Sequence, residues 1–226
     1  GVDLELESGV DLRIDQTAGV RDNVVEIDVT LTSGETSPTT AGEWRGGHIT
    51  GGRLFTNALA GLQVDSGGYG IAVHNGASKS IIGLTIEKQT IGGGLGAIRF
   101  SSELNRTGSG NETQWCQIVR CTLDGTTRFE AEDGLIAVDC VAIGRVSGGP
   151  AYEWDMTRGA FCSGVFRGTA AGIGGAAQIV NGSMVKLHNV QIEHAGTAAT
   201  GLLGGAQIVV LGQDYKSQAV EIIGCN

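Results

Sequence analysis

A short phrase of alternating aliphatic residues recurs along the chain, and this repeat constrains the fold more than any other feature of the sequence. Each copy has an aliphatic-x-aliphatic segment, a small or amide residue and a second aliphatic pair, and the copies begin at Ser80, Cys116, Leu135, Ala160, Val185 and Val220. The alternation is typical of a β-strand with one inward and one outward face. The small or amide residues are Gly83, Cys121, Cys140, Ser163, Asn189 and Cys225. We expect them to occupy one bend and to stack on each other in a ladder.

The spacing of these bends predicts a repeat fold. The period is roughly 20 to 30 residues, which is typical of solenoids, because each turn buries its apolar face only by stacking on its neighbours. Helical repeats need long amphipathic stretches, whereas the 39 glycines of this chain interrupt it throughout. Propeller blades need repeats of about 40 to 50 residues. The sequence therefore favours a β-solenoid.

A second, shorter strand is predicted before each phrase. These segments begin at Gly70, Gly96, Gly149, Ala177 and Ala206. Successive strands, turns and bends form one coil, and stacked coils build three parallel sheets around one apolar interior. We therefore expect an all-β chain that folds as a single-stranded right-handed parallel β-helix of roughly nine or ten coils. Residues 1–226 form one domain, and we expect a fragment of a longer chain, because the last phrase ends at Asn226 without a visible cap.

The charge of the chain excludes some partners. The formal net charge is −9, and no cluster of lysine or arginine occurs along the sequence. Nucleic acid and anionic membrane surfaces are therefore poor partners. No apolar run approaches the roughly 20 residues that cross a bilayer, so no membrane insertion is expected.

The five cysteines indicate packing rather than chemistry. Their number is odd, and they include no C-x-x-C pair and no histidine at zinc-ligand spacing. We therefore expect no metal site and no cofactor. Cys121, Cys140 and Cys225 occupy the predicted bend, and we interpret them as small buried residues of the core. A disulfide between adjacent coils stays open, because neighbouring bends would lie close enough to form one.

Two acidic segments contain the paired carboxylates that glycoside hydrolysis requires. The candidate catalytic residues are Glu132, Asp133, Glu153 and Asp155. Segments 130–133 and 152–155 lie one coil apart in the predicted repeat, so we expect stacking to bring Glu132 or Asp133 near Glu153 and Asp155. The alternative is a solvated acidic face on an acidic protein.

Five aromatic residues are candidates for binding the apolar faces of a sugar. They are Trp44, Tyr69, Trp115, Tyr152 and Trp154. Trp115 follows the long polar insertion 104–112, and binding residues concentrate in such loops on a rigid scaffold. Trp44 and Tyr69 lie beside glycine-rich turns. Two interpretations stay open for these three residues, which are a platform on which a sugar stacks and a contact with a partner subunit.

The segment Glu43–Phe55, the coils punctuated by Asn, Gly and Ser, and the terminal Val220–Asn226 resemble the pectate-lyase-like β-helices, and among these the tailspike and tail-fibre proteins of bacteriophages. The resemblance extends from Trp44 to Asn226 and includes no catalytic motif. It implies a homotrimer that recognises host surface polysaccharide, associates with other virion tail proteins and acts outside the host cell as part of the phage tail. Many members also cleave the polysaccharide, so depolymerase activity is open for this chain.

Two other functions are compatible with the same residues. One is a secreted polysaccharide lyase or glycoside hydrolase that acts as a monomer, although the basic residues are too scattered for a polyuronate groove. The other is a purely structural β-solenoid that forms a shaft segment. Glycan binding and oligomeric state separate these two functions from phage adhesion.

Overall fold

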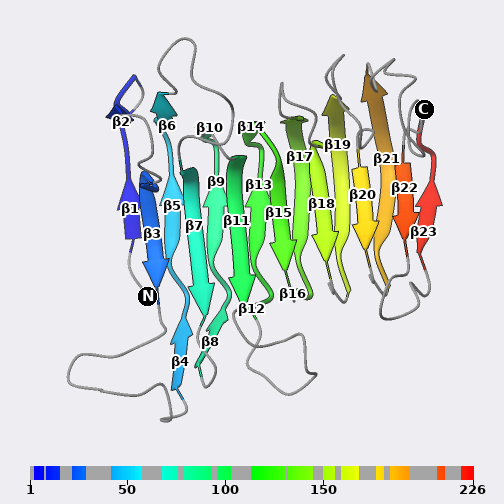
Figure 1. The fold of residues 1–226 in the computed structure, drawn as a ribbon, viewed down its shortest axis with the longest axis horizontal. Coiled ribbons are helices and arrows are strands. Elements are labelled where there is room, and N and C mark those ends of the chain that lie inside the picture. Colours follow the sequence, from blue (N-terminus) through cyan, green and yellow to red (C-terminus); the bar gives the residue numbers. More distant parts are fainter. Residues whose placement is uncertain are drawn as a thin grey trace.

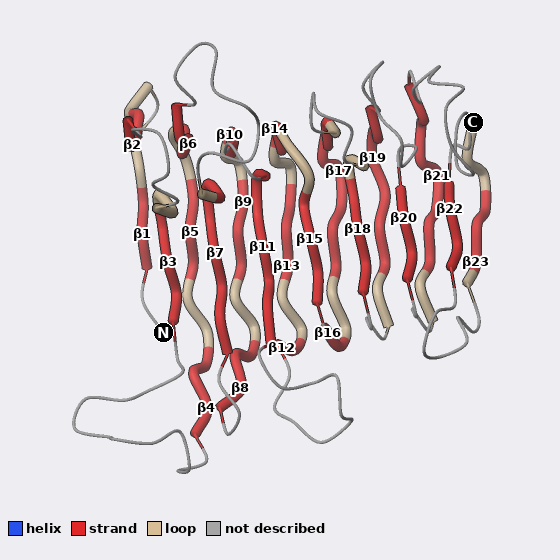
Figure 2. The backbone as a smooth tube through the Cα atoms, viewed as in Figure 1, coloured by secondary structure: helices blue, strands red, loops and turns tan. Residues whose placement is uncertain are grey.

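The computed structural model of the chain describes residues 3–7, 9–15, 22–28, 42–57, 68–75, 79–92, 96–102, 113–130, 132–144, 150–155, 159–167, 177–180, 184–193, 208–211 and 220–226. Every regular element in this part is a β-strand, and Figure 2 shows turns between the described strands. The described segments include no helix long and apolar enough to cross a membrane. The all-β prediction is confirmed for this part of the chain.

The strands form three sheets, which we name A, B and C. Sheet A contains β1 (Asp3–Glu5), β2 (Asp11–Asp15), β5 (His48–Thr50), β6 (Arg53–Asn57), β9 (Thr85–Glu87), β10 (Thr90–Gly92), β13 (Gln117–Val119), β14 (Thr122–Asp124), β17 (Ile136–Ile143), β19 (Phe161–Arg167), β21 (Lys186–Glu193) and β23 (Glu221–Ile223). Sheet B contains β3 (Val25–Asp28), β7 (Tyr69–Asn75), β11 (Gly96–Ser102), β15 (Thr127–Glu130), β18 (Tyr152–Asp155), β20 (Ala177–Val180) and β22 (Ile208–Leu211). Sheet C contains β4 (Gly42–Arg45), β8 (Lys79–Ile82), β12 (Thr113–Gln114) and β16 (Glu132–Asp133).

Successive repeats of the chain lie side by side along the long axis of the molecule (Figure 1). The described strand pairs are parallel, and sheet B runs in the order β3-β7-β11-β15-β18-β20-β22. Each repeat therefore supplies a strand to sheet A and then a strand to sheet B. This order confirms the predicted arrangement of parallel strands in sheets.

The number of repeats is smaller than the sequence suggested. One ladder of sheet A runs β1-β5-β9-β13-β17-β19-β21-β23, so the described residues provide eight strands rather than the nine or ten coils expected. The reason is that several repeats are longer than the average assumed. For example, His48 pairs with Thr85, and Thr85 pairs with Gln117.

The interior is filled by ladders of side chains in register. In sheet A, Ile118 and Ala137 are partners in neighbouring strands, and both side chains are fully buried. In sheet B, the rings of Phe100, Phe129 and Trp154 stack in sequence, with centroid separations of 5.6 and 6.1 Å. Such ring pairs contribute about 0.5–1.5 kcal/mol each beyond the burial of their area. The parallel register therefore places like side chains on top of each other inside the molecule.

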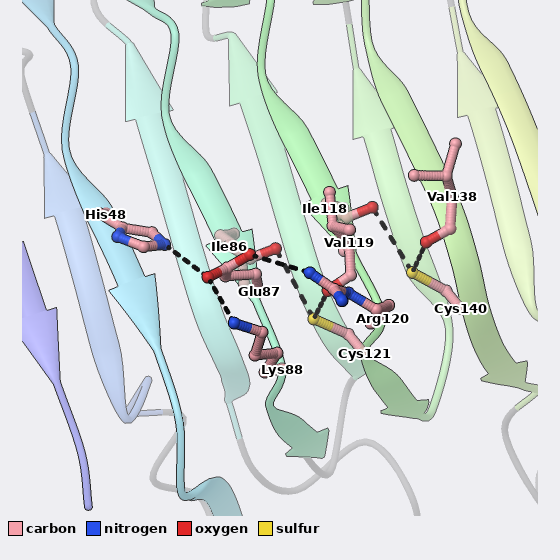
Figure 3. A network of polar contacts seen from close by, with 10 residues as sticks. All are labelled: His48, Ile86, Glu87, Lys88, Ile118, Val119, Arg120, Cys121, Val138 and Cys140. Atoms are coloured by element: carbon pink, nitrogen blue, oxygen red, sulfur yellow. Dashed lines mark hydrogen bonds and ion pairs between the residues drawn. The ribbon is translucent and has the colours of Figure 1, made fainter.

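The bend between the two halves of sheet A repeats a left-handed backbone conformation. Its non-glycine members are Lys88, Arg120, Asp139 and Asn189, whose φ angles lie between 51° and 55°. Cys121 and Cys140 each follow one of these residues, and the N–H of Val141 donates to the carbonyl of Cys121 at 2.9 Å. The Cys121 thiol donates to the carbonyl of Val119 at 3.4 Å, and the Cys140 thiol donates to that of Val138 at 3.3 Å (Figure 3). Equivalent thiols therefore make equivalent hydrogen bonds in neighbouring repeats.

The predicted ladder of bend residues needs correction at three positions. Gly164, and not Ser163, pairs with Cys140, because β19 has one residue fewer than β17 at this bend. Asn189 likewise precedes the residue that pairs with Gly164. Gly83 lies in a different bend, before β9. The ladder was misaligned for two reasons. β19 lacks one residue at this bend, and each repeat contains a second, similar bend before its sheet A strand.

All five cysteines are free thiols, so no disulfide links neighbouring repeats in this structure. Cys116, Cys121, Cys140 and Cys162 are buried, and Cys225 is partly exposed. The hydrogen bond with the Cys140 thiol, together with burial, raises the pKa of the Cys121 thiol. Burial raises the pKa of the Cys162 thiol. The predicted packing role is confirmed for the four buried cysteines.

We predict that Trp154→Ala destabilises the fold by about 3–5 kcal/mol, because its indole is fully buried and stacks on Phe129. Trp115→Ala is the matched control. It removes an indole that is 62% exposed and is expected to cost less than about 1 kcal/mol. Denaturant midpoints of the two variants and the parent chain measure the difference. Equal losses in the two variants would contradict the inward position of Trp154.

Candidate functional site

An exposed tryptophan lies at the corner where the chain enters sheet A. Trp115 is 62% exposed and has a φ of 55°, a left-handed conformation that is rare for a bulky residue. The equivalent corners, two residues before strands of sheet A, are Gly46, Gly83, Trp115, Gly134, Gly159 and Met184, and all have positive φ. Glycine adopts this conformation without strain. A bulky residue that is held in a strained conformation at the surface is a candidate for function.

The indole of Trp115 lies against the next repeat. A Cβ atom added at Gly134 would be 2.5 Å from a ring carbon of Trp115, so only glycine leaves room for the ring there. At Gly83, in the preceding repeat, an added Cβ would meet no atom within 4 Å. Glycine at 134 therefore lets the indole lie on the next repeat, and the residue remains 62% exposed as a platform on which a ligand can stack.

Two amide residues lie close to Trp115 in the sequence. Gln114 is half-buried and Gln117 is exposed, and both lie within two residues of Trp115. Amide groups donate and accept hydrogen bonds, as the hydroxyl groups of a sugar also do. Carbohydrate ligands combine an apolar C–H face with polar edges, so an indole beside amides suits them. Trp115 was predicted from the sequence as a binding residue, whereas Gln114 and Gln117 were not.

The predicted catalytic carboxylates lie in two different sheets. Glu132 and Asp133 form β16 in sheet C, whereas Glu153 and Asp155 lie on β18 in sheet B. β18 pairs with β15 and β20, and Glu130, the last residue of β15, is the register partner of Asp155. The chain leaves sheet B after Glu130 and enters sheet C, where Glu132 and Asp133 pair with β12, so the approach of these two residues to Glu153 and Asp155 stays a prediction. The side chains of Glu132, Asp133 and Asp155 lie outside the described part of the structure.

Glu153 has an arginine partner. The distance between Arg128 Nη2 and Glu153 Oε1 is 3.5 Å. An arginine stabilises the charged form of a carboxylate, whereas a general acid must hold a proton. Glu153 is therefore better placed to balance charge on the outer face of sheet B than to donate a proton.

Two of the predicted binding aromatics belong to the core. Tyr152 and Trp154 are fully buried, because the alternation along β18 points them inward and leaves Glu153 half-exposed on the outer face. Neither ring offers a surface to a sugar, so the prediction is wrong for both. The segment alternates aromatic and acidic residues, and burial of the aromatic set is the orientation that removes more apolar area from water.

The two remaining aromatic candidates lie in other sheets. Tyr69 begins β7 and is half-exposed, and the guanidinium of Arg99 lies 6.0 Å from the centroid of its ring. The ring contacts Gly96, where an added Cβ would lie 2.8 Å from a ring carbon. Trp44 lies on β4 opposite Ile81, and its side chain lies outside the described part of the structure. Tyr69 is therefore a second accessible aromatic, on sheet B, away from the Trp115 corner.

A charged network on sheet A joins three neighbouring repeats (Figure 3). The carboxylate of Glu87 lies 3.4 Å from His48 Nε2, 3.3 Å from Lys88 Nζ and 3.7 Å from Arg120 Nη2. A hydrogen bond from Lys88 and the nearby positive charges lower the pKa of Glu87. The sequence gives no sign of this network, because its members are adjacent only after the repeats have stacked.

Within the described ranges, no group of three or more His, Cys, Asp or Glu side chains is arranged to hold a metal ion. Comparison of the chain with family models, curated proteins and solved structures found no match. The exposed Trp115 corner is therefore the feature from which a function can be inferred.

We predict that Glu87→Gln reduces the loss of stability in acid. The pKa of Glu87 is lower in the folded chain than its ordinary value of 4.5. Its stabilising contribution is therefore present above about pH 4.5 and is lost as the pH falls through the lower, folded-state pKa. Denaturant midpoints measured from about pH 6 to about pH 3 should fall more steeply for the parent chain than for the variant. Parallel profiles would show that Glu87 does not contribute to the acid response.

Proposed function

We propose that the strands form a single-stranded right-handed parallel β-helix, and that this β-helix binds polysaccharide on the host surface as a bacteriophage tailspike or tail-fibre protein. The parallel pairing of the strands supports the fold. The regular order in which each repeat adds strands to sheet A and then to sheet B also supports the fold. A β-helix of this kind is a rigid rod whose corners and side faces are available for ligands.

The exposed indole of Trp115 is the single observation that supports glycan binding most directly. This large apolar residue lies against Gly134 and is nevertheless 62% exposed, in a left-handed conformation that is rare for a bulky side chain. Glycine at 134 leaves room for the ring on the next repeat, and two amide residues close to Trp115 in the sequence are suited to hydroxyl groups. A glycan that stacks on the indole accounts for all three features.

Binding, rather than cleavage, is the activity that we propose. Glycoside hydrolysis needs two carboxyl groups about 5–9.5 Å apart, one of which holds a proton. Among the described side chains of the predicted catalytic set, Glu153 lies beside Arg128. The charge of that pair suits recognition of a polar ligand better than acid catalysis.

The phage assignment is supported by the sequence resemblance of residues 44–226 to tailspike and tail-fibre proteins. On the basis of this assignment we also propose that the chain forms a homotrimer, associates with other virion tail proteins and is located in the phage tail. The low density of basic residues and the net charge of −9 agree with a protein that works outside the cell on a glycan surface.

We predict that the purified chain is retained by at least one capsular or lipopolysaccharide preparation from a panel of bacteria. Trp115→Ala should bind that glycan about tenfold more weakly, because an aromatic stacking contact contributes about 1 kcal/mol or slightly more. Met184→Ala is the matched control. It changes an equivalent corner with a φ of 52° and 53% exposure, and it should bind as the parent chain does.

Retention and the release of reducing ends should be measured in the same samples. Retention without release is the result that we expect. If no preparation retains the parent chain, the glycan-binding proposal fails. If Trp115→Ala and Met184→Ala bind equally well, the Trp115 corner is not the site. Reducing ends released above the blank would overturn the restriction to binding.

A further inference from the structure

The outer face of sheet A becomes apolar over two neighbouring repeats. The burial of β17 alternates so that Ala137, Cys140 and Ala142 are buried, Val138 and Val141 are half-exposed and Asp139 is exposed. The apolar face consists of six half-exposed residues of β17 and β19: Ile136, Val138, Val141, Ile143, Phe161 and Val165. They are adjacent in space, because β17 and β19 pair in parallel along their length. Contiguous apolar area on the outside of a sheet is characteristic of a contact with another molecule.

The aligned positions in the repeats on either side are polar with one exception, because Val138 aligns with Val119 in the preceding repeat. Ile136 aligns with Gln117 in the preceding repeat, and Phe161 aligns with Lys186 in the following one. Val141 aligns with Thr122, and Thr122 aligns with Thr90. Apart from Val119, the apolar character is therefore local to two repeats and is bounded by polar residues along the molecule. An apolar centre with a polar rim is the usual organisation of a protein interface.

The charges at the rim are balanced within the chain. On one side, the carboxylate of Glu87 is surrounded by His48, Lys88 and Arg120. On the other side, Arg167 Nη2 lies 2.7 Å from a carboxylate oxygen of Glu193. These pairs leave little net charge around the face, although the chain as a whole carries −9.

Further along the same rim, Glu221 lies 2.7 Å from His188 Nε2 and 3.3 Å from Lys186 Nζ. Asp139 is exposed at the bend within β17, one repeat after Arg120. Two copies of an acidic chain repel each other over most of their surface. The repulsion is smallest where carboxylates already have cationic partners, and this is also where the apolar residues gather.

We propose that the apolar face of β17 and β19 is the surface through which copies of this chain associate side by side. Around a three-fold axis each copy turns the same face inward, so the apolar residues of this face are removed from water together, while balanced charges at the rim limit repulsion. The inference rests on the homotrimer of the proposed function and specifies the face that forms it. Trp115 is not one of the six residues of this face, although its indole lies against Gly134, two residues before Ile136.

The test uses the full chain and measures its mass in solution by sedimentation equilibrium. We expect the parent chain to sediment as a multiple of 23.2 kDa and the double variant Val141→Glu, Val165→Glu to sediment as a monomer. Thr90→Glu is the matched control. It places the same charge in the same row of sheet A, outside the apolar face, and should leave the parent mass unchanged. Circular dichroism establishes whether each variant is folded.

A second double variant, Val141→Thr and Val165→Thr, keeps β-branched side chains and covers the case in which the charged variant does not fold. We expect it to weaken association by at least tenfold. A monomeric parent chain would overturn both this inference and the proposed homotrimer, whereas glycan retention through Trp115 would stand or fall separately. An oligomeric parent with oligomeric, folded variants would overturn the assigned face and leave the homotrimer intact. Loss of association in Thr90→Glu would also contradict the assignment.

Discussion

The backbone hydrogen bonds between stacked parallel strands are the interaction on which the rest of this structure depends. The N–H of Val141 donates to the carbonyl of Cys121, and the N–H of Thr127 donates to that of Ala151, each at 2.9 Å. Such bonds fix the register between repeats, and the register decides which residue of every strand faces the core. The stacked aromatic rings, the thiol bends, the Glu87 network and the exposed corner at Trp115 are all consequences of one alignment.

The sequence was sufficient for the class of fold and for parts of its interior. Alternating aliphatic residues and small bends predicted parallel strands with buried cysteines, and both are observed. It was not sufficient for the register, because repeat length varies and β19 lacks one bend residue. The orientation of 152–155 was also ambiguous, since aromatic and acidic residues alternate there. In the structure, Trp154 faces inward and stacks on Phe129 of the paired strand.

The functional corner shows a similar division. Trp115 was predicted as a binding residue because it follows a long polar insertion. Its position depends on the backbone conformation of the corner and on the residue at 134, and the insertion indicates neither. The corner favours a left-handed backbone, and glycine at 134 leaves space for the indole. The apolar face of β17 and β19 was equally hidden, because a strand with aliphatic residues on both sides resembles a strand buried on both sides. Such features become visible only when neighbouring repeats are in place.

The register itself can be tested by disulfide trapping in solution. Neighbouring parallel strands lie about 4.8 Å apart, which suits a disulfide, whereas strands two repeats apart lie about 10 Å apart and do not. Gln117, Ile136 and Phe161 are successive partners on the outer face of sheet A. The double variant Gln117→Cys, Ile136→Cys should form an intramolecular disulfide under mild oxidation, detected by peptide mass mapping, and Gln117→Cys, Phe161→Cys should not. A disulfide in the second variant but not in the first would contradict the stacking order.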